Sequence, residues 1–135
     1  MSSFREQKIT PNTPWTQLDR IEINGVTSHI ADITSVATRI FQYANYEDAR
    51  DDANGTEVGT VITTAAASCM YDTLQLDGMW NNRDRIGYNC RVTIPKARFL
   101  NGGKFYRIEN VVTPASGETF NLVPWILDAR TSAID

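Results

Sequence analysis

The stretch KFYRIENVVTPASGETFNLVPWILDA, residues 104–129, decides the fold class of this chain. Its first half alternates along the chain, with Phe105, Arg107 and Glu109 on one side and Tyr106, Ile108 and Asn110 on the other. An alternation with a period of two residues is typical of a half-buried β-strand. The turn-forming residues ASGE, at 115–118, then separate this run from a second run of similar character. We therefore expect an antiparallel hairpin at this end of the chain.

Similar signals recur toward the N-terminus. Asn24 and Gly25 form the dipeptide that is favoured in tight hairpins, and short apolar runs flank them. Residues 35–45, SVATRIFQYAN, alternate and are rich in β-branched and aromatic side chains, as half-buried strands are. Residues 56–76 supply one or two further strands, and residues 88–95, YNCRVTIP, supply another.

These runs amount to about seven or eight strands, spaced about 8–12 residues apart, with turn residues between them. The fold class that they predict is all-β, an antiparallel two-sheet sandwich of the immunoglobulin-like kind. The chain has 135 residues and 41% hydrophobic content, which is enough for a single core. We predict one β-sandwich domain over residues 18–135, preceded by an extended N-terminal arm over residues 1–17.

The predicted arm carries the first candidate contact residues. Pro11 and Pro14 both favour extended backbone over a packed helix. We expect the segment to contact a neighbouring molecule, and a disordered tail is the alternative. The candidate contacts of the arm are Phe4, Pro11, Pro14 and Trp15.

Composition argues against several functional classes. A net charge of −3 and a pI near 5.1 argue against a dedicated nucleic-acid-binding protein. No apolar run approaches the roughly 20 residues of a membrane-spanning helix. The N-terminus also lacks the apolar segment of a secretory signal, so we expect synthesis in a cytoplasm and no membrane partner.

The residue types needed for catalysis or metal binding are scarce. Cys69 and Cys90 are too few for a disulfide scaffold or a structural zinc site. We expect two buried thiols, and a bridge between them is the alternative. His29 is the only histidine, which leaves a catalytic triad without its parts. The acidic segment at residues 46–55 is expected to form a loop. Arg50 interrupts any calcium-binding pattern there. We expect no enzymatic activity, cofactor or metal.

The most distinctive segment is YDTLQLDGMWNNRDRIGYNCRVTIP, residues 71–95. In immunoglobulin-like sandwiches a tyrosine near the start of a strand often forms a hydrogen bond back to the preceding turn. The run DRIGY fits such a corner, in which Asp84 holds turn amides, Gly87 permits the bend and Tyr88 packs inward. The residues that we predict to form the structural corner and core are Trp80, Asp84, Gly87, Tyr88, Tyr106 and Trp125.

A carbohydrate site is the functional alternative for the same residues. Trp80, Tyr88 and Trp125 would then be stacking platforms for a sugar, with nearby Asn and Asp side chains bonding its hydroxyl groups. A glycosidase would further need two carboxylates that flank the cleaved bond. The sequence gives no reason to pair any two of its acidic residues.

Charge is unevenly distributed along the chain. Residues 81–107 carry a local net charge of +6, whereas residues 47–57 carry −4. Two interpretations remain open, namely solvated faces or a bipolar surface that docks copies or a partner in a fixed orientation. On the second interpretation, Arg83 and Arg85 are candidate assembly contacts.

Four short motifs resemble small β-sandwich structural proteins of tailed bacteriophages. They are the D-x-x-W of residues 77–80, the G-Y-N of 87–89, the glycine turn and Y-R strand of 103–107 and the TPASGE of 113–118. The resemblance covers roughly residues 71–120, and the first 70 residues show no such motif. The last hairpin is also similar to that of phage head-closure proteins, which occupy the neck.

The resemblance implies a virion component without catalytic activity, synthesised in the host cytoplasm. Its partners would be other virion proteins, of the capsid, portal or neck, and copies of itself. The expected function is thus that of a structural protein on the capsid surface or in the neck. A carbohydrate-binding module, with a glycan as ligand, is the alternative, and a minor hydrolase is the third possibility.

Overall fold

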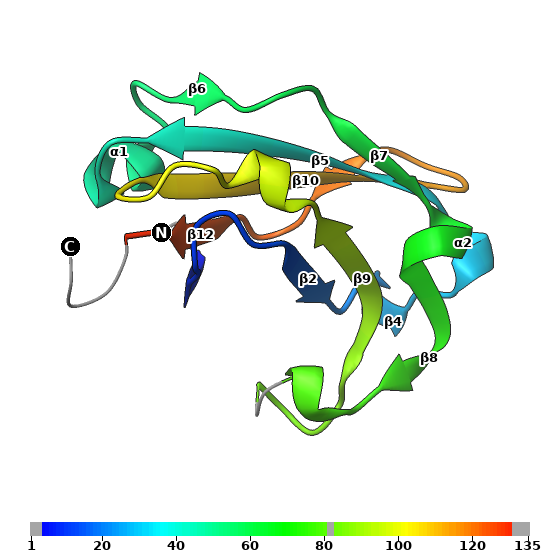
Figure 1. The fold of residues 1–135 in the computed structure, drawn as a ribbon. Coiled ribbons are helices and arrows are strands. Elements are labelled where there is room, and N and C mark those ends of the chain that lie inside the picture. Colours follow the sequence, from blue (N-terminus) through cyan, green and yellow to red (C-terminus); the bar gives the residue numbers. More distant parts are fainter. Residues whose placement is uncertain (1–3, 81–82, 131–135) are drawn as a thin grey trace.

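The computed structural model describes residues 4–80 and 83–130, which form an all-β sandwich (Figure 1). The predicted fold class is therefore confirmed. A large sheet forms one layer, and a three-stranded sheet in the order β2-β9-β8 packs against it. The strands of this smaller sheet are β2 (Trp15–Asp19), β8 (Met70–Gln75) and β9 (Tyr88–Ile94).

Two long antiparallel strands form the centre of the large sheet, which has the order β1-β12-β10-β5-β6. The free edge of each central strand is filled by two short strands placed end to end. β6 and β7 pair with β5, while β11 and β12 pair with β10. The strands of this sheet are β1 (Arg5–Lys8), β5 (Ile33–Tyr43), β6 (Thr56–Glu57), β7 (Ile62–Ala65), β10 (Phe105–Pro114), β11 (Phe120–Asn121) and β12 (Trp125–Asp128).

The remaining elements are short. β3 (Glu22–Ile23) and β4 (Val26–Thr27) form the predicted hairpin, in which Asn24 and Gly25 both have positive φ angles. The helices are α1 (Tyr46–Asp51) and α2 (Ala66–Cys69), with 3-10 turns η1 (Ile30–Asp32), η2 (Gly78–Trp80) and η3 (Lys96–Arg98).

The main core lies between the two sheets and follows the predicted alternation. In β5, Val36, Thr38 and Ile40 are fully buried, as the sequence pattern of this strand predicts. The facing residues of β10, β9 and β12 complete the core, and they include Tyr106, Ile108, Val112, Cys90, Val92, Ile94 and Leu127.

A buried polar chain also joins the two layers. The Thr38 hydroxyl of β5 donates to Asn110 Oδ1 of β10 at 2.7 Å. Asn110 Nδ2 in turn donates to Gln17 Oε1 of β2, also at 2.7 Å. Because buried polar groups are costly unless they are paired, these bonds favour one relative placement of the two sheets.

The predicted N-terminal arm is extended but is not separate from the domain. β1 pairs with β12 in parallel, which also departs from a purely antiparallel arrangement. β2 pairs with β9, and Trp15 at its start is buried against Trp125 in an edge-to-face contact at 5.1 Å between ring centroids. The arm therefore supplies an edge strand and part of the core.

The acidic segment that we expected to be a loop contains helix α1. Asn45 caps the helix by accepting a hydrogen bond from the Asp48 amide at 2.9 Å, and Asp52 ends it in the left-handed conformation. Arg107 of β10 donates to the carbonyl oxygens of Ala49 and Arg50 at the end of α1. The composition suggested a loop, but the caps and this distant arginine stabilise a helical turn.

Removal of residues 1–10 tests whether the arm belongs to the fold. The deletion removes β1, the buried Ile9 and the ion pair between Arg5 and Asp19. We expect the free energy of unfolding, measured by urea titration, to fall by about 3 kcal/mol or more. Val26→Ala, at an exposed position, is the control and should cost less than about 0.5 kcal/mol. An unchanged stability of the deletion variant would show that the segment is a free arm.

Candidate functional site

Three aromatic side chains pack together where β8 connects to β9. Tyr71 comes from β8, Trp80 from η2 and Tyr88 from the start of β9. Trp80 and Tyr88 are 3% and 1% exposed, and their ring centroids lie 5.6 Å apart. Tyr71 packs edge-on against Tyr88 at 5.9 Å. We call these three residues the aromatic cluster, and Leu18 of β2 packs against it.

Asp84 holds the aromatic cluster and the adjacent turn together. Its Oδ1 atom accepts hydrogen bonds from three donors: Trp80 Nε1 at 2.8 Å, the Ile86 amide at 2.8 Å and the Gly87 amide at 3.0 Å. Its Oδ2 atom accepts from Arg20 at 2.7 Å. The Gly87 amide and the Arg20 guanidinium hold the pKa of Asp84 well below its usual range. The carboxylate thus stays ionised while it fixes the Trp80 indole.

Glycine is required at position 87 of the same turn. Its φ angle is +104°, and a Cβ atom added there would lie 2.3 Å from the carbonyl oxygen of Gln75. The turn leads into Tyr88, whose hydroxyl donates to Asp77 Oδ2 at 2.9 Å. Burial and this bond raise the pKa of Tyr88 to about 12. The structure thus places Trp80, Asp84, Gly87 and Tyr88 next to one another, as predicted.

The other two predicted core residues lie elsewhere. The Tyr106 hydroxyl accepts from the Asn101 amide at 3.2 Å, and its ring packs edge-on against Phe99 at 5.1 Å. A tyrosine hydroxyl bonded to backbone a few residues upstream is the corner that we expected at Tyr88. The corner geometry therefore occurs at Tyr106, whereas Tyr88 bonds a side chain. Trp125 is buried in the main core.

The predicted assembly contacts divide into buried and accessible residues. Trp15 is buried, and Phe4 is half-buried where it packs against the smaller apolar cluster around Tyr43, so both contact this chain, and their role as assembly contacts stays a prediction. Pro11 is half-buried, and Pro14, Arg83 and Arg85 are exposed.

Two arginines of the positively charged segment, residues 81–107, form hydrogen bonds within the chain. Arg98 donates to the carbonyl oxygens of Val58 and Thr60, both at 2.7 Å. Arg107 donates hydrogen bonds to two carbonyl oxygens at the end of α1. These two guanidinium groups join neighbouring segments of the same chain, so the positive local charge of the sequence overstates the charge available to a partner.

Arg83 connects the aromatic cluster to the main core. Its guanidinium carbon lies 3.9 Å from the ring centroid of Trp80 and 5.4 Å from that of Trp125. One of its nitrogens donates to the Leu18 carbonyl oxygen at 2.7 Å. Beside it opens a cavity of about 390 Å³, which we call the arginine cavity. Its lining residues are Arg5, Arg20, Glu22, Trp80, Arg83 and Asp84.

A buried carboxylate adjoins the arginine cavity. Asp19, at the end of β2, is 2% exposed and pairs with Arg5 through Oδ1, while its Oδ2 atom has no hydrogen-bonding partner among the described residues. Burial raises the pKa of Asp19 to about 6, although the guanidinium groups of Arg5 and Arg83 oppose the shift. Asp19 therefore changes charge within the pH range of ordinary solution experiments.

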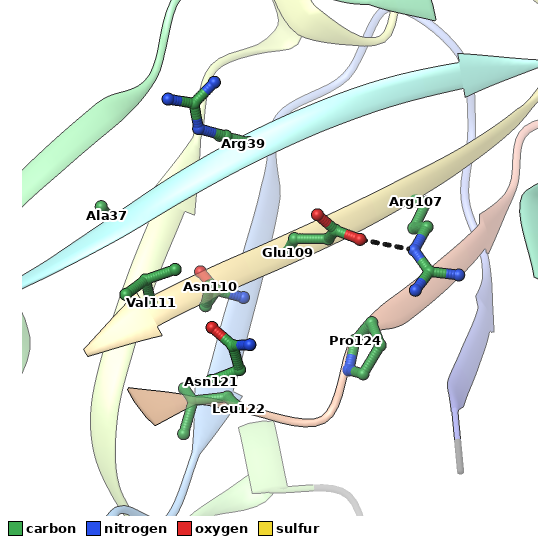
Figure 2. A pocket seen from close by; sticks show the side chains of 9 residues that line it. All are labelled: Ala37, Arg39, Arg107, Glu109, Asn110, Val111, Asn121, Leu122 and Pro124. Atoms are coloured by element: carbon green, nitrogen blue, oxygen red, sulfur yellow. Dashed lines mark hydrogen bonds and ion pairs between the residues drawn. The ribbon is translucent and has the colours of Figure 1, made fainter. Parts of the chain in front are cut away.

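A second cavity, of about 190 Å³, lies where β5, β10 and the segment from Asn121 to Pro124 meet (Figure 2). Its main charged pair is Arg107 with Glu109, at 2.8 Å. Arg107 also holds the end of α1, and Arg39 at the rim pairs with Glu57 at 3.2 Å. The charged groups of this cavity are thus engaged with partners in the same chain, and we assign it a structural role.

The remaining groups that sequence analysis singled out show no reactive arrangement. Cys69 and Cys90 are buried free thiols, and the hydrogen bond between them together with burial raises the pKa of Cys90. Residues 4–80 and 83–130 contain no group of three His, Cys, Asp or Glu side chains placed to hold a metal ion. Within the same ranges, no helix has the length and apolar character needed to cross a membrane.

Comparison of the chain with protein-family models, with curated proteins and with solved structures found no match.

The titration of Asp19 gives a testable pH dependence. Its folded-state pKa of about 6 exceeds the unfolded value near 4, so its stabilising contribution is full below pH 4 and is lost as the pH rises through 6. We expect the protein to lose about 1–2 kcal/mol of unfolding free energy between pH 5 and pH 8 through this group. In Asp19→Asn this loss should disappear.

Urea titrations at pH 5 and pH 8 measure the effect. Asp51→Asn changes an exposed carboxylate of α1 and should keep the pH dependence of the unsubstituted protein. An Asp19→Asn variant with an undiminished pH dependence would contradict the assignment.

Proposed function

We propose that this protein is a non-enzymatic structural component of a tailed-phage particle, at the capsid surface or in the neck. The observation that carries the proposal is the burial of the aromatic cluster. Trp80 and Tyr88 pack inside the domain and are bonded to Asp84 and Asp77, so both rings brace a loop, and Trp80 in addition lines the arginine cavity. The phage assignment itself rests on the sequence motifs of residues 71–120.

The same burial weighs against the carbohydrate alternative. Trp15, Trp80 and Trp125 are all the tryptophans of the chain, and they are 6%, 3% and 7% exposed. A stacking platform must present the face of a ring to the sugar. The face of Trp80 is instead covered by the Arg83 guanidinium. No tryptophan of the chain therefore offers such a platform.

An exposed apolar group provides a surface for protein contacts. Leu76, Met79 and Ile86 are 59%, 43% and 54% exposed, and all three lie in the segment between β8 and β9. Figure 1 shows the described part of this segment, residues 76–80 and 83–87, on the side of the domain away from the large sheet. We call these three residues the exposed tip. We infer that these three side chains contact a neighbouring subunit, where repetition by particle symmetry makes modest contacts effective.

The exposed tip is tested by a triple variant, Leu76→Ser/Met79→Ser/Ile86→Ser. Because these side chains are exposed, we expect its urea midpoint to stay close to that of the unsubstituted protein. We also expect the variant to be depleted at least about tenfold from particles, since each lost apolar contact contributes about 1 kcal/mol or more. The measurement is quantitative mass spectrometry of phage particles purified from the host that carries the gene.

A matched control is Val26→Ser/Leu100→Ser/Val123→Ser, which changes three exposed apolar residues elsewhere on the domain. It should be incorporated normally. Absence of the unsubstituted protein from purified particles would overturn the proposed function. Normal incorporation of the tip variant would overturn the role of the exposed tip alone.

A further inference from the structure

The arginine cavity gathers three cationic groups from separate segments of the chain. Arg5 begins β1, Arg20 follows β2, and Arg83 lies in the connection between β8 and β9. Their side chains reach one cavity of about 390 Å³, together with the carboxylates of Glu22 and Asp84. Such convergence of guanidinium groups needs a reason, because like charges at close range repel.

Two of the three guanidinium groups have carboxylate partners in the chain. Arg5 pairs with the buried Asp19, and Arg20 pairs with Asp84 at 2.7 Å. Arg20 also lies 3.8 Å from Glu22. The acidic groups at the cavity are therefore already associated with Arg5 and Arg20.

Arg83 is the exception. Among the described residues it forms no ion pair, and the one hydrogen bond of its guanidinium is donated to a neutral acceptor, the Leu18 carbonyl oxygen. A guanidinium carries five N–H donors, so most of those on Arg83 remain available. Burial and repulsion by Arg5 lower the pKa of Arg83, which indicates that the cation is less stabilised than in water.

The environment of Arg83 also fixes its orientation. The guanidinium stacks on Trp80 at 3.9 Å, and Trp80 is itself held by the hydrogen bond from its indole to Asp84. A stacked guanidinium presents its N–H groups around its edge, in the geometry that matches the two oxygens of a carboxylate. The site is thus organised in advance for a planar oxyanion.

We propose that the arginine cavity binds a carboxylate through Arg83, supplied in the assembled particle by an acidic side chain of a neighbouring subunit. The neighbouring subunit as the source rests on the proposed function, whereas the binding of a carboxylate does not. The bound oxygens would accept hydrogen bonds from the free N–H donors of Arg83, while Arg5 and Arg20 stay paired with the carboxylates of this chain.

Titration of the isolated protein with succinate tests the binding step. The readout is the indole N–H resonance of Trp80 in a proton–nitrogen correlation spectrum, with sodium chloride at matched ionic strength as the blank. We expect a saturable shift with a dissociation constant of about 1–10 mM, as befits a single small anion. Inorganic phosphate is titrated in parallel.

Three variants locate the site. Arg83→Gln should weaken succinate binding at least about tenfold, because it removes the charge-assisted hydrogen bonds. Arg83→Lys should also weaken it, since lysine keeps the charge but lacks the planar donor array. Arg85→Gln changes an exposed arginine two residues away that does not line the cavity, and it should bind succinate normally.

The outcomes separate the parts of the proposal. No saturable shift, or equal succinate affinity in Arg83→Gln, would overturn the binding site. Binding of phosphate without succinate would overturn the carboxylate assignment. If succinate binds through Arg83 but purified particles retain Arg83→Gln as well as the unsubstituted protein, the neighbouring-subunit source is wrong. Absence of the unsubstituted protein from particles would instead count against the proposed function.

Discussion

The Asp84 carboxylate is the constraint on which the β8–β9 end of the domain depends. It accepts hydrogen bonds from two turn amides, from the Trp80 indole and from the Arg20 guanidinium. These bonds join a loop, an aromatic ring and the end of β2. With Trp80 fixed, Tyr88 and Leu18 can pack against it and Arg83 can stack on it. Local turn chemistry therefore determines the position of a large side chain and, through that side chain, the position of a charge.

This arrangement separates structural residues from accessible ones within a short stretch of chain. Trp80 and Tyr88 turn inward, whereas Met79 and Ile86, each within two residues of them, remain exposed. The exposed tip lies in that segment, which also contributes Trp80, Arg83 and Asp84 to the arginine cavity.

Sequence patterns predicted the elements that local signals specify. The turn at Asn24 and Gly25, the alternation in β5 and the hairpin of β10 with β11 and β12 all depend on residues that are close in sequence. The α1 helix was missed because a short acidic segment resembles a loop until its cap at Asn45 is recognised. The N-terminal arm was misjudged because its partner, β12, lies at the opposite end of the chain. The arginine cavity could not be foreseen, since Arg5, Arg20 and Arg83 come together only through the tertiary fold.

The most direct test of this account is the free energy of unfolding of Trp80→Ala, measured by urea titration against the unsubstituted protein. A buried brace between a loop and a sheet should cost about 3–5 kcal/mol when its ring is removed, because a cavity replaces it and Asp84 loses a donor. A loss below about 0.5 kcal/mol is the result expected of a solvent-exposed ring whose role is to bind a ligand. That result would contradict the structural role of the aromatic cluster.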